Sequence, residues 1–218
     1  MTPEAGGRRS EVGGRRSEAG RPSVAIVDYR AGNLTSLLKG LTAAGATPFV
    51  SSNPDELSAA DAIVVPGVGN FGATTAIDEG MRGAIADAAT AGRPLLGICL
   101  GLQFLFDGSE EAPDVPGLGL LPGRCDLLHG DVKVPHVGWN TLERRRDSVL
   151  LTGVGAGASV YFTHSYAAPV TNACVASATH GTTFAAVVDD GRVFGVQFHP
   201  EKSGEDGMRI LRNFVALC

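Results

Sequence analysis

The sequence has little of what would tie the chain to an oxidising compartment or to a zinc scaffold. Its four cysteines are widely spaced and include no CxxC pair, which argues against a disulfide framework and a structural zinc site. No apolar stretch of the secretory-signal kind is seen, so we expect reduced thiols in a cytoplasmic protein. The cysteines are Cys99, Cys125, Cys174 and Cys218.

Long apolar runs and basic excess are lacking too. The longest run of apolar residues and glycine, 95–102, is far shorter than the roughly 20 residues that cross a bilayer. Lys and Arg number 18 against 23 Asp and Glu, a net charge of −5, whereas nucleic-acid binders usually carry a basic excess. The five histidines form no HExxH motif. We therefore expect no membrane, no nucleic acid, no metal and no cofactor.

Residues 1–22 differ in composition from everything after them. GGRRSEV (6–12) and GGRRSEA (13–19) form a tandem repeat with almost no apolar content. Such a segment buries too little surface to offset its ordering entropy, so we expect a disordered tail and assign it no function. A single domain at 23–218 follows.

The body of the chain begins with apolar runs that alternate with helical patterns. The runs at 24–28, 48–51, 62–65 and 94–98 are typical of buried strands, and helices are predicted from 34, after an Asn33 cap, and over 74–91. This alternation predicts an α/β fold with a mostly parallel central sheet flanked by helices. Beyond Gly108, short runs predict an added antiparallel portion, before a last helix at 205–217; these runs are 124–128, 132–135, 159–163, 173–177, 184–188 and 192–198.

A nucleophile-elbow pattern follows the fourth predicted strand. In GICLG (97–101) the central residue is Cys99, and the flanking glycines permit a sharp strand-to-helix turn that exposes its side chain. The helix that begins at Leu100 would favour the thiolate, which is the attacking form. A cysteine in an apolar run can also be simple core packing.

His199 and Glu201 follow the last predicted strand, in HPE (199–201). A thiol nucleophile needs a histidine that moves its proton, and that histidine needs a carboxylate that fixes its tautomer. Taken alone, the pair could be a surface His and Glu at a strand end. Together with the elbow it predicts a Cys-His-Glu triad, whereas no serine lies in a GxSxG context.

A glycine-rich loop, PGVG (66–69), follows the third predicted strand. Acyl transfer needs backbone N–H donors for the developing oxyanion, and this loop with Leu100 could supply them. A plain turn is the alternative. A phosphate cradle is not favoured, because GxxxxGK[ST] and GxGxxG are both lacking.

These motifs together resemble a known family. GICLGLQ (97–103) with HPE (199–201) resembles the class I, triad-type glutamine amidotransferases, whose fold is flavodoxin-like. DYRAGNLTSL (28–37), PGVGNFG (66–72), PHVGWN (135–140) and YFTHSY (161–166) are similar to the glutaminase subunits of imidazole glycerol phosphate synthase, in histidine biosynthesis. The resemblance runs from about Val24 to the C-terminus, with Leu102 where methionine is usual.

The resemblance implies a mechanism and a role for each matching residue. Cys99 attacks the glutamine carboxamide, His199 shuttles the proton and Glu201 orients His199, through a γ-glutamyl thioester. The oxyanion hole is assigned to Val68, Gly69 and Leu100, and glutamine binding to Gly67, Gln103, Glu111, His164, Ser165 and Tyr166.

The resemblance also implies a partner, a (β/α)₈-barrel cyclase that receives the ammonia in a heterodimer and makes imidazole glycerol phosphate and an aminoimidazole carboxamide ribotide. Asn33, Tyr161 and Lys202 match positions at that interface, and loop 67–69 is expected to be aimed correctly only when the partner is loaded. Three alternatives stay open: an amidotransferase of anthranilate, aminodeoxychorismate or purine synthesis, a stand-alone cysteine hydrolase, and a non-catalytic subunit on the same fold.

Overall fold

The predicted strands come together in one eight-stranded mixed sheet. The computed structural model describes residues 20–218, so the prediction of a disordered tail at 1–22 lies outside the described residues except at 20–22. The strand order is β2-β1-β3-β4-β13-β12-β11-β8. Neighbours from β2 to β13 run parallel, and β12, β11 and β8 continue the sheet antiparallel. The predicted α/β class is confirmed.

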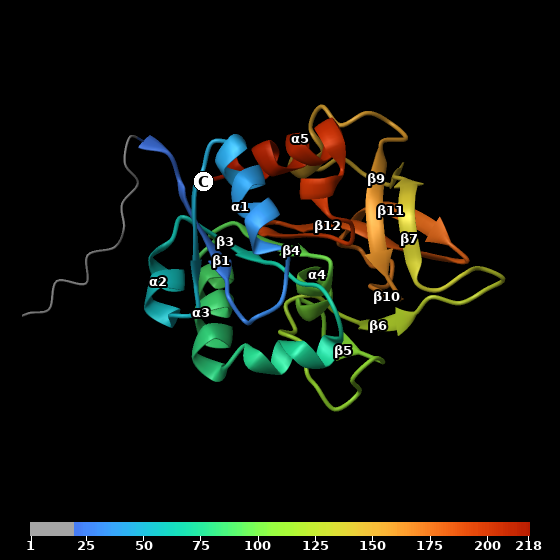
Figure 1. Ribbon diagram of the computed structural model, residues 1–218, viewed down its shortest axis with the longest axis horizontal. Coiled ribbons are helices and arrows are strands. Elements are labelled where there is room, and N and C mark those ends of the chain that lie inside the picture. Colours follow the sequence, from blue (N-terminus) through green and yellow to red (C-terminus); the bar gives the residue numbers. More distant parts are fainter. Residues whose placement is uncertain (1–19) are drawn as a thin grey trace, which may run out of the picture.

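Helices cover both faces of the parallel half. Val24 and Ile26 of β1 pack into one apolar layer, and Ala25 and Val27 into the other, because successive side chains of a strand point to opposite faces. Each fully buried Val or Ile side chain among these contributes about 1.5–3 kcal/mol. The strands of this half are β1 (Ser23–Val27), β2 (Thr47–Ser51), β3 (Ala62–Val65), β4 (Leu95–Ile98) and β13 (Val193–Val196). Helices α1 (Leu34–Ala43) and α5 (Gly204–Val215) lie on one face, and α2 (Pro54–Ala59) and α3 (Glu79–Thr90) on the other (Figure 1).

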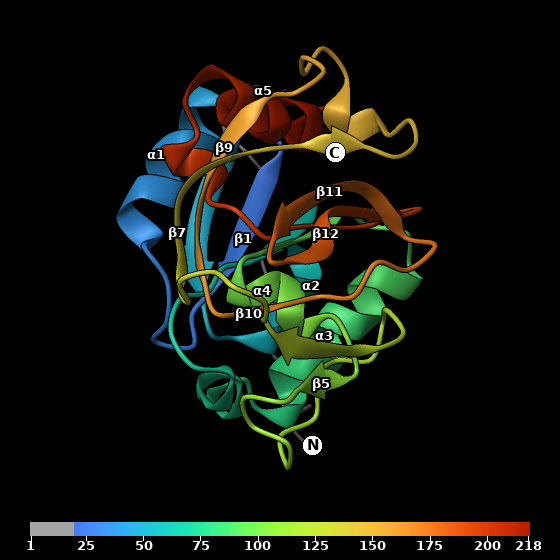
Figure 2. The same ribbon diagram turned by 90° about the vertical axis from the view of Figure 1, so that its right-hand side faces the viewer.

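The antiparallel portion extends the main sheet and adds two small sheets. The extension comprises β12 (Thr182–Asp190), β11 (Cys174–His180) and β8 (Glu143–Arg144). A two-stranded sheet pairs β7 (His136–Thr141) with β9 (Ser159–His164), which run side by side in Figure 2. A three-stranded sheet joins β10 (Tyr166–Ala167), β6 (Arg124–Leu127) and β5 (Gly108–Ser109). A short helix, α4 (Leu100–Phe104), follows β4, and a 3-10 helix at Val149–Leu151 lies between β8 and β9.

Two predicted elements are wrong, one in its extent and the other altogether. The helix predicted over 74–91 is a 3-10 helix (Phe71–Ala76) followed by α3, because Asp78 accepts a hydrogen bond from the Met81 backbone N–H (2.9 Å) and caps a new helix. The run 132–135 is not a strand. Val134 is exposed, and Pro135 has no N–H to donate to a ladder, so β7 begins at His136.

Candidate active site

Cys99 sits at the tight turn between β4 and α4. Its backbone has φ 55° and ψ −109°, a conformation that non-glycine residues rarely adopt and that costs energy to hold. The flanking glycines make the turn possible: a Cβ at Gly97 would lie 2.7 Å from Leu102 Cα, and one at Gly101 would collide with the Val65 carbonyl. The strained thiol position is therefore built by close packing of β3, β4 and α4.

His199 lies beyond the end of β13, which is the parallel neighbour of β4. Its Nδ1 is 3.1 Å from Glu201 Oε1, and both side chains are almost fully buried. A carboxylate accepts, so Nδ1 carries the hydrogen, and Nε2 is the atom left for exchange with a thiol. Nε2 is buried and has no hydrogen-bond partner among the described residues. The Ser203 hydroxyl holds the loop by donating to the His199 carbonyl (2.7 Å).

The electrostatics of His199 favour its charged form. Burial lowers the pKa of this imidazole, but the Cys99 side chain and the Glu201 carboxylate outweigh burial and raise the pKa to about 9. His199 is therefore an imidazolium at neutral pH, able to stabilise a nearby thiolate and to donate a proton to a leaving group.

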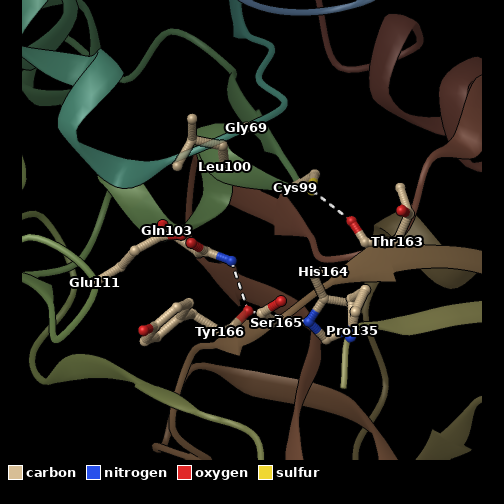
Figure 3. Close-up of a pocket in the computed structure, with 10 residues that line it drawn as sticks. All are labelled: Gly69, Cys99, Leu100, Gln103, Glu111, Pro135, Thr163, His164, Ser165 and Tyr166. Atoms are coloured by element: carbon tan, nitrogen blue, oxygen red, sulfur yellow. Dashed lines mark hydrogen bonds between the residues drawn. The ribbon is translucent and has the colours of Figure 1, made fainter. Parts of the chain in front are cut away.

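A cavity of about 320 Å³ opens beside Cys99 (Figure 3). The Cys99 Sγ lies 3.8 Å from the Thr163 carbonyl oxygen and 3.7 Å from Gln197 Nε2. Glu111, on the opposite wall, accepts a hydrogen bond from the Phe71 backbone N–H (2.7 Å). The cavity is lined by Gly69, Cys99, Leu100, Gln103, Glu111, Pro135, Thr163, His164, Ser165 and Tyr166. Its size and mixed lining suit one small amino acid.

Not every lining side chain is free to meet a ligand. Gln103 Nε2 donates to the Tyr166 carbonyl (2.7 Å) and to Gln197 Oε1 (3.2 Å). Both ring nitrogens of His164 are engaged, with His136 (3.1 Å) and with the Tyr166 carbonyl (3.0 Å). The 164–166 segment would therefore meet a ligand mainly through its backbone and through Ser165.

The glycine-rich loop is held in place where it begins. The Tyr29 hydroxyl donates to the Pro66 carbonyl (2.6 Å), and a Cβ at Gly67 would lie 2.6 Å from Leu100 Cβ. Gly69 has φ 97° and lines the main cavity. Gly67 and Val68 instead line a second, narrow cavity, with Asn33, His199 and Glu201 among its other lining residues. The loop thus lies between the thiol side and the imidazole side of the site.

The remaining predicted residues, those of the expected interface, lie near His199 and Glu201. The Lys202 Nζ is 5.9 Å from the Tyr161 ring centroid, and the Trp139 ring lies 6.1 Å from the Tyr161 ring. Val137 and Trp139 of β7 are 58% and 59% exposed, so an aromatic and apolar surface surrounds these positions.

Sequence reasoning did not single out several of these residues. Gln197 and Thr163 contact the thiol, and His136 contacts His164. A glutamine inside the apolar strand run 192–198 was a usable signal for Gln197, whereas the other two depend on strand register. Among residues 20–218 no helix is long and apolar enough to cross a membrane, and no group of side chains there is arranged to hold a metal ion.

Residues 25–218 match the protein family described as glutamine amidotransferase class-I. The curated "Imidazole glycerol phosphate synthase subunit HisH" of Halobacterium salinarum is 51% identical, covering 90% of this chain and 94% of its own length. The same subunit of Gloeobacter violaceus is 50% identical and covers 89% of each chain. That of Methanosarcina acetivorans is 45% identical, covering 89% of this chain and 98% of its own.

Solved structures with less sequence in common share the architecture. The structure of PurLQS from Thermotoga maritima aligns with a TM-score of 0.71 at 22% identity, over 90% of this chain and 98% of that one. A crystal structure described as a glutamine amidotransferase aligns with a TM-score of 0.68 at 20% identity, over 88% and 97%. At such identities the likeness shows the fold alone.

Proposed function

Since this chain belongs to the class I glutamine amidotransferases, and within them to the HisH subunits of imidazole glycerol phosphate synthase, we propose that Cys99, His199 and Glu201 are its catalytic triad. The enzyme is a glutaminase of histidine biosynthesis. The observation that carries the triad is the orientation of His199, whose Nδ1 faces Glu201 while its buried Nε2 is unpartnered, beside a cysteine in a strained turn.

The reaction begins with attack of the Cys99 sulfur on the side-chain carboxamide carbon of glutamine. The carbonyl oxygen becomes an oxyanion, for which the backbone N–H groups of Val68, Gly69 and Leu100 are the proposed donors. His199 Nε2–H protonates the amide nitrogen, the C–N bond breaks, and ammonia leaves a γ-glutamyl thioester. A water molecule, deprotonated by His199, then attacks the thioester carbon, and the C–S bond breaks. This step gives glutamate and returns the Cys99 sulfur and the charged His199 ring to their starting state.

Glutamine binding is proposed along the main cavity. The Glu111 carboxylate suits the α-ammonium group, and backbone N–H groups of the 164–166 segment suit the α-carboxylate. Gln103 and Gly67 shape the site: Gln103 through its bond to the Tyr166 carbonyl, and Gly67 by leaving room next to Leu100.

The relatives are named as subunits of a synthase, which implies a partner subunit. We propose that this partner is the (β/α)₈-barrel cyclase and that the two chains form a heterodimer. Asn33, Tyr161 and Lys202 lie at the proposed interface, together with exposed Val137 and Trp139, because aromatic side chains are enriched in such surfaces. Lys202 directly follows the triad glutamate, so contact there would couple docking to catalysis. A Lys202→Ala complex that keeps full cyclase activation of glutamine hydrolysis would contradict that coupling.

The test is glutamate release from glutamine, measured with and without the barrel cyclase and its ribonucleotide. We expect slow turnover by the isolated chain and strong activation in the loaded complex. The reason is that loop 67–69, which lines the cavities on both sides of the site, is expected to be aimed correctly only when the partner is loaded. Cys99→Ala serves as the blank. Fast turnover unaffected by the cyclase would leave the thiol mechanism intact and would contradict the proposed partner.

A further inference from the structure

Three histidines that take no part in the proposed triad gather beside the glutamine cavity. His136 of β7 and His164 of β9 are cross-strand partners in the β7–β9 ladder, and His180 ends β11. The His136 ring stacks on the His180 ring with 4.1 Å between centroids and contacts the His164 ring edge-on at 5.1 Å. His136 and His164 are buried, and His164 lines the cavity (Figure 3).

The hydrogen bonds between these rings can run in only one direction. A backbone carbonyl only accepts, so His164 Nδ1, 3.0 Å from the Tyr166 oxygen, carries the hydrogen. Neutral His164 then has a bare Nε2, which must accept from His136 Nδ1 at 3.1 Å. His136 Nε2 is therefore bare as well, and it accepts from Asn140 Nδ2 at 3.3 Å.

At the Asn140 end of this series of hydrogen bonds, two further contacts independently fix the same donor-to-acceptor direction. Asn140 Oδ1 accepts from the Thr141 backbone N–H (2.8 Å), and Asn140 Nδ2 donates to the Thr179 carbonyl (3.0 Å). Both contacts hold the amide with its nitrogen toward His136. Burial also keeps the rings neutral, lowering the pKa of His136 to about 4 and that of His164 to about 3.

At the other end, beside the cavity, this series of hydrogen bonds terminates at the Tyr166 carbonyl. It accepts from His164 Nδ1 and also from Gln103 Nε2, so both of its lone pairs are used. Gln103 continues to Gln197, whose Nε2 lies 3.7 Å from the Cys99 sulfur. The backbone between Thr163 and Tyr166 is thus fixed from the β7 side and from the thiol side at once.

We infer that His136 and Asn140 are positioning residues: they hold His164 as its Nδ1–H tautomer and so fix the 163–166 backbone against which the amino-acid end of glutamine binds. This inference rests on the proposed function for the identity of the ligand. Rotation or tautomer exchange of His136 would place two N–H groups, or two bare nitrogens, face to face. If His164 changed its own tautomer to pair with the altered His136, the Tyr166 carbonyl would lose the bond from His164 Nδ1.

The first test reads the tautomers directly in the unaltered full chain. Long-range nitrogen–proton NMR of the imidazole rings at neutral pH is expected to show Nδ1–H and a bare Nε2 in both His136 and His164. An Nε2–H form of either ring would overturn the inference. The result needs no catalytic turnover, so it stands whether or not the proposed glutaminase reaction is confirmed.

The second test compares two variants of similar size in the cyclase complex. His136→Asn keeps a donor near the position of Nδ1, whereas His136→Leu has none. We expect His136→Leu to raise KM for glutamine about 10-fold, the effect of one lost buried hydrogen bond, with kcat changed less than about 3-fold. His136→Asn should restore most of the affinity, and His129→Leu, at an exposed histidine, should leave both constants unchanged.

Alkylation of Cys99 by iodoacetamide separates positioning from damage to the triad, because this reagent does not need the amino-acid subsite. Its rate should be the same in the unaltered chain and in His136→Leu. An unchanged KM in His136→Leu, or an equal loss of kcat in both His136 variants, would overturn the inference. Failure of the proposed function would look different, as no glutamine turnover by the unaltered complex.

Discussion

Cys99 is held in a backbone conformation that costs energy, and its replacements should reveal that cost. We expect Cys99→Ala and Cys99→Gly both to abolish glutamine hydrolysis, because each removes the proposed nucleophile. Glycine adopts positive φ readily, so Cys99→Gly should be more stable than Cys99→Ala by about 1 kcal/mol. Urea unfolding of the two variants measures the difference. Equal stability would mean that the turn is not strained, and residual hydrolysis would exclude Cys99 as the nucleophile.

Because the pKa of His199 is raised, the stability of the folded protein should depend on pH. The ordinary value is 6.5 and the folded value about 9, so the charged ring stabilises the folded state fully below pH 6.5. That contribution is lost as pH rises from 6.5 through 9. In Glu201→Gln the folded pKa falls, and the unaltered protein should exceed the variant in stability by more at pH 6 than at pH 9.5.

The measurement is urea unfolding at both pH values, with an NMR titration of the His199 ring to report its pKa. His199→Gln is the control. Its free energy of unfolding should differ from that of the Glu201→Gln, His199→Gln double variant by the same amount at both pH values, because no imidazole is left to titrate at position 199. An unaltered His199 pKa in Glu201→Gln would contradict the assigned role of Glu201.

At the scale of elements, the junction of β3, β4 and α4 depends on a helix residue without a side chain. A Cβ at Gly101 would collide with the Val65 carbonyl, which is main chain and has little freedom to move. We expect Gly101→Ala to lower the free energy of unfolding by about 1–3 kcal/mol, as other overpacked sites do, and to displace the elbow. Thermal unfolding and glutaminase assays measure the two effects.

The matched control is Gly83, which also lies in a helix. A Cβ there meets nothing within 4 Å, and the residue is exposed on α3. Gly83→Ala should therefore raise stability by about 0.5–1 kcal/mol through helix propensity. If both substitutions destabilised the protein equally, close packing at Gly101 would not be the cause.

The elements that sequence predicts well are those whose patterns are local. Buried strands and the GxCxG turn follow from short runs of residue type, and so did α1 and α5, which begin within one residue of where they were predicted. The break before α3 was missed because the helical pattern runs through Asp78, where a side-chain cap decides the outcome. His136 and His164 are 28 residues apart in the sequence. Their contact depends on the register of β7 with β9, which no local pattern encodes.

At the scale of the whole molecule, the outer face of β7 should govern association with the proposed cyclase partner. Trp139 is 59% exposed and contacts the Tyr161 ring, as expected for the aromatic centre of an interface. We expect Trp139→Ala to raise the Kd of the complex at least about 10-fold, in the range of large interface truncations. Val149→Ala, at another exposed apolar residue, in the 3-10 helix between β8 and β9, should leave the Kd unchanged.

Isothermal titration calorimetry of each variant with the barrel cyclase measures these affinities. At a cyclase concentration well above the new Kd, Trp139→Ala should recover its glutaminase activity. Unchanged affinity would place the interface elsewhere on the molecule.

The alternation of side chains along β7 constrains how this strand can change in length. His136 and Asn140 point toward the cavity wall, while Val137 and Trp139, between them, point outward. Substitutions alter one side at a time, but a single inserted or deleted residue would exchange the two sides, turning the indole inward and the imidazole to solvent. Homologous chains should therefore keep the length of β7, with insertions and deletions confined to the loops at either end.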